Sequence, residues 1–192
     1  MNKVRFLLAM SLVSIMAGCV VAPQSVYLRK SPSGKFFENM ETKSSKDVSY
    51  TFESKEPDPF QFNKINIDLN ESYASNLKHY MNNKYSIVQD QGDSNVDFIL
   101  QSCKVEVRNA GADVIYGSSG YSAAIYNITV STELNVKVAV NANGNISEKE
   151  IITLGEYTGN SSDLTTGQMS FNLAIEKSIL LIDRFLDKAF AE

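Results

Sequence analysis

The sequence predicts an α+β fold, an antiparallel meander sheet with two helices packed on one face, behind an N-terminal leader and a flexible tether. Two patterns predict this class. Apolar and polar residues alternate strictly over residues 126–140, which indicates a long strand with one buried face. Apolar residues recur at helical spacing over residues 165–189, which indicates an amphipathic helix that packs on the sheet.

The first residues of the chain have the pattern of a targeting segment. Lys3 and Arg5 precede an apolar run over residues 6–16. That run is too short for a permanent bilayer-spanning helix, which needs about 20 apolar residues. A basic start followed by a short apolar region is typical of a secretory signal peptide, so we expect residues 1–18 to be removed.

The end of this leader, Met16-Ala-Gly-Cys19, resembles the lipobox of bacterial lipoproteins, with Met16 at the position usually held by Leu. The resemblance implies cleavage before Cys19, a diacylglycerol thioether on its sulfur and acylation of the new N-terminus. Two or three acyl chains hold a protein on a membrane, because each buried CH₂ contributes about 0.8 kcal/mol. Val20 stands where Asp would resemble an inner-membrane retention signal. The resemblance therefore implies the outer membrane of a Gram-negative cell, with the body facing the periplasm.

Composition limits the classes of partner. Without the leader the chain has 16 Lys and Arg against 22 Asp and Glu, a net charge of about −6. An acidic body argues against nucleic-acid binding and against electrostatic docking on anionic lipid. We expect residues 19–46 to form the lipid-anchored tether and residues 47–192 a single periplasmic domain, long enough to bury a core.

In the first half of the domain the spacing of apolar residues changes twice, from strand-like to helical and back. Alternation over residues 48–52 and again over 65–69 predicts two strands, separated by the breaker Pro57-Asp58-Pro59. Helical spacing predicts a short helix over residues 71–83, with Asn70 or Ser72 as its cap. A strand is expected from Tyr85. The domain therefore begins in the order β-α-β.

A meander and a second helix follow. Residues 96–107 alternate with a change of phase near Gln101-Ser102, which indicates a bulge or a strand covered on both faces. The strand over 126–140 leads into an Asn/Gly turn at residues 141–145, and residues 148–158 return as its partner, with Ile152 and Leu154 inside or paired. The helix over residues 165–189 completes the domain.

Several of these segments together resemble the YajG-type family of bacterial outer-membrane lipoproteins. They are the lipobox, "NNKYSIVQD", "NVDFILQSCKVEV", "YNITVSTELNVKVAVNANG" and the final helix, over roughly residues 65–190. The resemblance implies a periplasm-facing lipoprotein without established catalysis. The chain departs from it by a Gly/Ser/Tyr insertion between the two central strands. A looser similarity to the lipoprotein TraT rests on the helix–strand order and a glycine-rich interruption.

The residues that carry chemistry do not form a recognisable set. His79 is the single histidine, on a polar helix, and one histidine with one spare cysteine makes no zinc site. No P-loop or G-x-S-x-G motif is present. Cys103 lies in an apolar run and is expected to be a small core residue, with a reactive or intermolecular thiol as the alternative. We expect no catalytic residues, no metal and no cofactor.

The segment over residues 110–126 is the informative exception. It contains Gly117-Ser-Ser-Gly120 and is uncharged except for Asp113, so it is either a long hairpin loop over the core or a contact surface. Tyrosine offers apolar area with a polar tip, and Gly and Ser allow close approach. Its candidate contact residues are apolar or aromatic: Val114, Ile115, Tyr116, Tyr121 and Tyr126.

These observations favour a non-enzymatic interaction module of the cell envelope, whose hairpin contacts another protein or a second copy. A binding protein for a small or lipidic ligand, held between sheet and helices, is the alternative. An envelope hydrolase ranks third, because it would need clustered acids with perturbed pKa values.

Overall fold

The computed structural model describes residues 24–25, 44–56, 60–62, 65–89, 94–116, 122–161 and 165–191. Only the backbone is described at residues 24–25, 60–62, 65–67, 69, 114–116 and 122–123. The predicted signal peptide and Cys19 lie outside these residues, as does most of the predicted tether.

The main sheet has five strands in the order β5-β2-β6-β7-β8. Their bounds are β2 Asp47–Ser54, β5 Ser86–Ile87, β6 Ser94–Tyr116, β7 Ser122–Ala142 and β8 Asn145–Asn160. The last three form the predicted antiparallel meander. The turn between β7 and β8 has positive φ at Asn143 (53°) and Gly144 (86°), as the Asn/Gly sequence predicted.

The rest of the sheet corrects the expectation of antiparallel pairing throughout. Strand β2 runs parallel to both β5 and β6, so the sheet is mixed. The chain leaves β2 and passes through helix α3 (Leu69–Lys84) before it returns at β5 and β6. A crossover that contains a helix allows the returning strand to run in the same direction.

Three short strands form a second sheet in the order β1-β4-β3, which the sequence did not predict as a separate unit. They are β1 Gln24–Ser25, β3 Phe60–Phe62 and β4 Ile65–Ile67. Strand β4 leads directly to α3, whose N-cap is Asp68. The Asp68 carboxylate accepts from the backbone N–H of Glu71 (2.8 Å), in place of the predicted caps Asn70 or Ser72.

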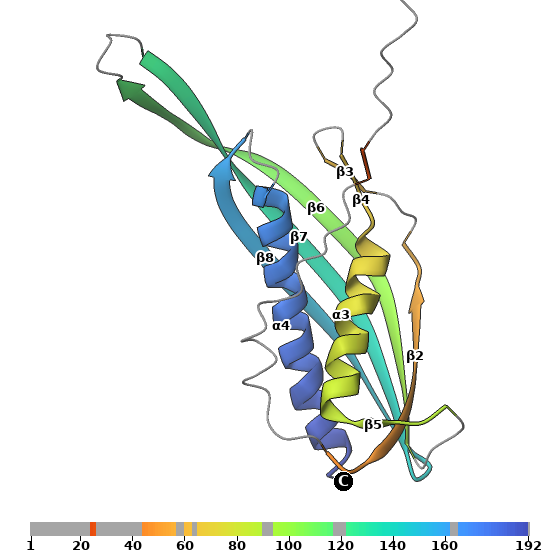
Figure 1. Ribbon diagram of the computed structural model, residues 1–192. Helices are drawn as coiled ribbons and strands as arrows, with labels where there is room; N and C mark the ends of the chain where they lie inside the picture. The colour runs from red at the N-terminus through yellow and green to blue at the C-terminus, as the bar shows by residue number, and fades with distance from the viewer. Residues whose placement is uncertain are drawn as a thin grey trace, which may run out of the picture.

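Helices α3 and α4 (Thr165–Ala189) lie on the same face of the main sheet (Figure 1), as predicted. The even-numbered side chains of β7 from Ile128 to Ala142 point to this face and are buried, in agreement with the alternation read from the sequence. The buried stripe of α4 packs against them. Its apolar members are Phe171, Ala174, Ile175, Ile179, Ile182 and Leu186.

Of the two alternatives predicted for Ile152 and Leu154, inside or paired, the structure shows pairing, with Asn135 and Glu133 of β7. Ile151, Thr153 and Gly155 are buried, whereas Ile152 and Leu154 are 59% and 44% exposed. The two-residue turn fixes this register, since Ala142 pairs with Asn145 and Val136 with Ile151. The small side chains on the helix-facing side allow close approach, because a Cβ added at Gly155 would meet the Ser170 carbonyl and lie 2.5 Å from the Ala174 nitrogen.

Candidate functional site

Strands β6 and β7 continue past the rest of the sheet as a two-stranded ribbon. Pairing between β7 and β8 ends at Asn127 and Asn160, where the Ser161 N–H donates to the Tyr126 carbonyl (2.8 Å). Residues 112–116 and 122–126 then pair only with each other among the described strands. Figure 1 shows this ribbon projecting beyond the first turns of both helices.

Large apolar side chains are exposed on the helix-side face of the sheet near the start of the ribbon. Val107 and Tyr157 are both cross-strand partners of Val130, and Tyr126 follows the even-numbered parity of β7. All of them therefore share the face that carries the core. Val130 is fully buried, yet Val107, Tyr126 and Tyr157 are 48%, 64% and 37% exposed. We call these three residues the ribbon face.

The first turns of helix α4 are held against strands β7 and β8 by hydroxyl contacts. Thr166 Oγ1 donates to the Asn160 carbonyl (3.3 Å), and Ser170 Oγ lies 2.8 Å from Thr132 Oγ1 and donates to the Gly155 carbonyl (3.0 Å). These contacts fix the first turns of α4 over the end of β8. The strands of the ribbon continue beyond this point, where the side chain of Tyr126 is 64% exposed.

The opposite face of the ribbon is polar and internally paired. Asn127 Nδ2 donates to Asp113 Oδ2 (2.7 Å), and the hydroxyls of Thr129 and Thr158 lie 2.8 Å apart. Arg108 and Glu106 form an exposed ion pair at 3.2 Å. The ribbon is therefore amphipathic across its two faces, as a strand pair in contact with a protein surface on one side would be.

The structure places the predicted contact residues in strands rather than in a loop. Strand β6 runs to Tyr116 and β7 starts at Ser122, so a hairpin is present and its strands are longer than predicted. Val114, Ile115 and Tyr116 pair through the backbone with Ala124, Ala123 and Ser122, while their side chains lie outside the description. Tyr121 lies outside the described residues. Tyr126 is the one candidate whose side chain is described, and it is exposed.

Sequence reasoning missed Val107 and Tyr157. Both fit an alternating strand pattern, which predicts the apolar face of a strand but not how far a helix covers it. Tyr157 belongs to the return strand, so pairing it with residue 130 required the register of β7 and β8. The register follows from the Asn143-Gly144 turn, and this was the available signal.

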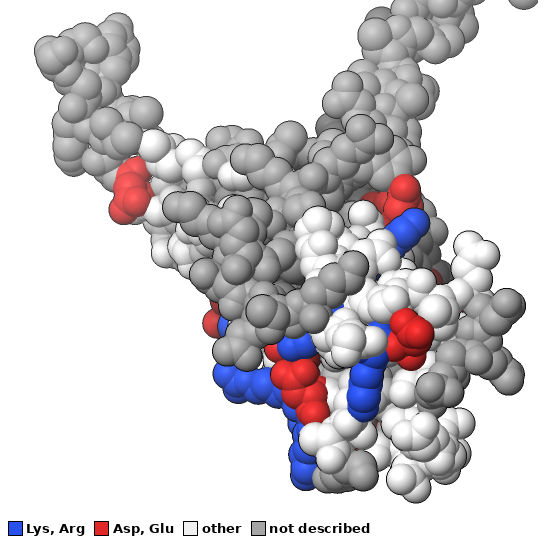
Figure 2. Space-filling view, turned by 60° about the horizontal axis from the view of Figure 1, so that its bottom comes forward, with Lys and Arg blue, Asp and Glu red and all other residues white. Residues whose placement is uncertain are grey.

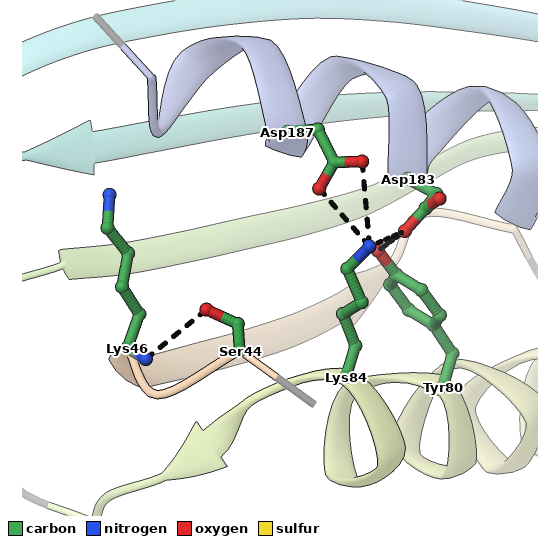
Figure 3. A network of polar contacts seen from close by, with 6 residues as sticks. All are labelled: Ser44, Lys46, Tyr80, Lys84, Asp183 and Asp187. Carbon is green, nitrogen blue, oxygen red and sulfur yellow. Dashed lines mark hydrogen bonds and ion pairs between the residues drawn. The ribbon is translucent and has the colours of Figure 1, made fainter. Parts of the chain in front are cut away.

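A separate polar cluster joins the helices at the other end of the molecule (Figure 3). Lys84 Nζ lies 3.1 Å from Asp183 Oδ1 and 3.2 Å from Asp187 Oδ1, and the Tyr80 hydroxyl donates to Asp183 Oδ1 at 2.9 Å. Burial lowers the pKa of Lys84, but the hydrogen bonds and charges of Asp183 and then Asp187 outweigh it and raise the pKa. Burial, followed by the nearby Tyr85 and Asp183, raises the pKa of Tyr80.

This cluster has the features of a structural contact. The Lys84 side chain is only 9% exposed and its charge is balanced by two carboxylates. Figure 2 shows acidic and basic side chains lying next to one another at this end of the molecule. The two ends therefore differ: one has mixed charge, and the ribbon is apolar on its helix side.

The described residues contain neither a metal-binding cluster nor a membrane-spanning helix. No group of three or more His, Cys, Asp and Glu is placed to hold a metal ion. No described helix has both the length and the apolar character needed to cross a membrane. His79 is exposed and lies 3.0 Å from Asn83 Nδ2, and Cys103 is partly buried against the core.

Comparison with known proteins yields similar folds only. No family model and no curated protein matches the chain. Protein XCC0632 from Xanthomonas campestris, described under the family model DUF330, is 14% identical with a TM-score of 0.38, over 88% of this chain and 97% of that one. A structure described as an uncharacterized protein is 9% identical with a TM-score of 0.35, over 85% and 99% of the two chains. At these values the likeness bears on neither family nor function.

Proposed function

We propose that the chain is a non-enzymatic lipoprotein of the YajG type, anchored through Cys19 to the outer membrane of a Gram-negative cell. It acts there as an interaction or assembly module of the envelope. Its ribbon contacts another protein in the periplasm. The observation that carries this proposal is the ribbon face, three large side chains from β6, β7 and β8 that are exposed on the helix side of the sheet, near and at the start of the ribbon.

Two physical arguments support a protein as the occupant. Exposed tyrosines with a nearby valine offer apolar area at low entropic cost, as in other recognition surfaces. A two-stranded ribbon in water is only marginally stable by itself, so contact with a partner stabilises it. Its helix-side residues do not attract an anionic surface by charge, because they are uncharged.

The alternative of a ligand held between sheet and helices has less support. Helix α4 approaches β8 closely enough that Gly155 has no space for a side chain. Hydroxyl contacts from Ser170 and Thr153 cross the same interface, the latter donating to the Ala174 carbonyl (3.1 Å). The space between these elements is filled by the protein's own atoms.

The anchor is tested by mass spectrometry of the chain purified from its host membranes. We expect the peptide that begins at Cys19 to carry a diacylglycerol and an acyl group. Cys19→Ser should release the body into the soluble fraction. An unmodified thiol at this residue, or a retained leader, would contradict the anchor.

The ribbon is tested by placing a photo-crosslinking residue at position 126 in intact cells. The matched control is position 146, because Ile146 is also an exposed apolar residue (72%) but lies at the opposite end of β7 and β8. We expect a discrete adduct from position 126 that is absent at 146. Equal labelling at both positions would refute a specific ribbon contact.

A further inference from the structure

The turn between β7 and β8 places an asparagine in a chemically reactive position. Asn143 and Gly144 are both exposed, and they form the only Asn-Gly pair in the sequence. Glycine has no Cβ, so the side chain of the following residue does not hinder the approach of its main-chain nitrogen to the Asn143 amide. A Cβ built at Gly144 would have no atom from elsewhere in the chain within 4 Å, so the turn is also open to solvent.

The same main-chain nitrogen is engaged in a hydrogen bond. The Gly144 N–H donates to Asn141 Oδ1 (3.1 Å). Attack on the Asn143 amide requires this N–H to lose its proton first. A hydrogen bond donated by the N–H stabilises the protonated nitrogen. The Asn141 side chain therefore opposes the reaction that the Asn-Gly sequence favours.

We propose that Asn143 is a site of spontaneous deamidation, and that Asn141 restrains this modification in the folded chain. The deprotonated Gly144 nitrogen attacks Cγ of Asn143 and forms a new C–N bond. The bond between Cγ and Nδ2 breaks, and Nδ2 takes up a proton and leaves as ammonia. Water then opens the resulting cyclic imide at either of its carbonyls, which gives aspartate or isoaspartate at position 143.

The two products affect the turn differently. Asp-Gly, like Asn-Gly, suits a two-residue turn with positive φ, so aspartate at position 143 keeps the pairing of Ala142 with Asn145. Isoaspartate carries the main chain through its side-chain carbon, which lengthens the turn and weakens the pairing that sets the register of β8. Both products add a negative charge. This modification goes beyond the proposed function, because it needs neither the lipid on Cys19 nor a partner at the ribbon face.

The modification is tested by incubating the purified full chain at mildly alkaline pH and sequencing the turn peptide by mass spectrometry. Asn141 and Asn145 are matched internal controls, because both are exposed and precede Ala142 and Ile146, whose side chains hinder the attacking nitrogen. We expect the amide to be converted to acid at Asn143 and to persist at the two controls. Equal conversion at all of these positions, or none at Asn143, would overturn the proposal.

Two substitutions test the restraint separately. Asn141→Ala removes the acceptor and should speed deamidation of the folded chain about two- to tenfold, the range expected for the loss of one hydrogen bond. Asn141→Asp keeps an oxygen acceptor and should react no faster than the native chain. Thermal unfolding confirms that both variants are folded.

Urea distinguishes the folded hydrogen bond from an effect of local sequence. In concentrated urea, where the turn is absent, Asn141→Ala and the native chain should deamidate at the same rate. An unchanged rate in folded Asn141→Ala, an acceleration that persists in urea, or equal acceleration in Asn141→Asp would refute the role of Asn141.

Discussion

The same two strands pass through two environments, and the difference between them is informative. Beneath the helices Val130 is fully buried, while its cross-strand partner Val107, on the same face, is 48% exposed. Both residues are valines in alternating segments. The alternation decides which face of the sheet is apolar, whereas the position of the helices over that face decides which of its side chains are buried. The exposed part of this face is the surface to which we assign a partner in the proposed function.

The largest effect is expected from adding volume under α4. Gly155→Val would force its side chain against the Ser170 and Ala174 backbone and displace the helix, so we expect a loss of about 3 kcal/mol or more in the free energy of unfolding. Ala112→Val, an addition on the exposed ribbon, should change stability by less than about 0.5 kcal/mol. Denaturant unfolding of both variants measures the contrast. Similar losses in both would mean that the ribbon is also packed.

The next largest loss of stability is expected from the polar cluster that joins helices α3 and α4. Asp183→Ala removes one of the two carboxylates on the nearly buried Lys84 and the acceptor of the Tyr80 hydroxyl, at a cost of about 2 kcal/mol. Glu133→Ala removes the exposed partner of Lys104 (3.4 Å) and should cost less than about 0.5 kcal/mol. Urea midpoints compare the two. An unchanged urea midpoint in Asp183→Ala would show that the cluster does not hold the helices together.

The matched valines provide a smaller and sharper contrast. Val130→Ala should lower the free energy of unfolding by about 1.5 kcal/mol, because two buried methyl groups are lost. Val107→Ala should cost less than half as much, since the side chain is already half in water. Chemical denaturation at equal protein concentration is the measurement. Equal losses of unfolding free energy in the two variants would contradict the difference in burial between Val130 and Val107.

Alkaline pH tests the buried contacts of helix α3. The pKa values of Tyr73, Tyr80 and Lys84 are raised in the folded state. A raised folded pKa gives stability that is present below the unfolded value and is lost as pH rises toward the folded one. Stability should therefore fall above about pH 10. Tyr80→Phe should flatten this fall. Thermal unfolding from pH 8 to 11 is the readout.

Local pattern was sufficient for most elements. The alternation over residues 126–140, the Asn143-Gly144 turn and the apolar stripe of α4 each encode their own structure, and the phase change near Gln101 marked the observed bulge. The parallel pairing of β2 was not encoded locally, because it depends on the path of the chain through α3. The register set by the turn decides which side chains of β8 face the helices. It buries Ile151 and leaves Ile152 exposed.

The candidate site was predictable only in part. Composition marked the hairpin around Tyr126, since uncharged Gly, Ser and Tyr residues stand out from the charged strands beside it. Val107 and Tyr157 join it through strand register and through the position of the helices over the sheet. Both are tertiary properties, and neither has a signal within a short window of sequence.

The rate of maleimide labelling tests most directly whether a partner covers the ribbon face. A Cys103→Ser chain with either Tyr126→Cys or Ile146→Cys is labelled in native membranes and again after solubilisation and purification. We predict that residue 146 reacts at the same rate in both states, while residue 126 reacts about tenfold more slowly in the membranes because a partner excludes the reagent. Equal rates at residue 126 in the two states would contradict the account.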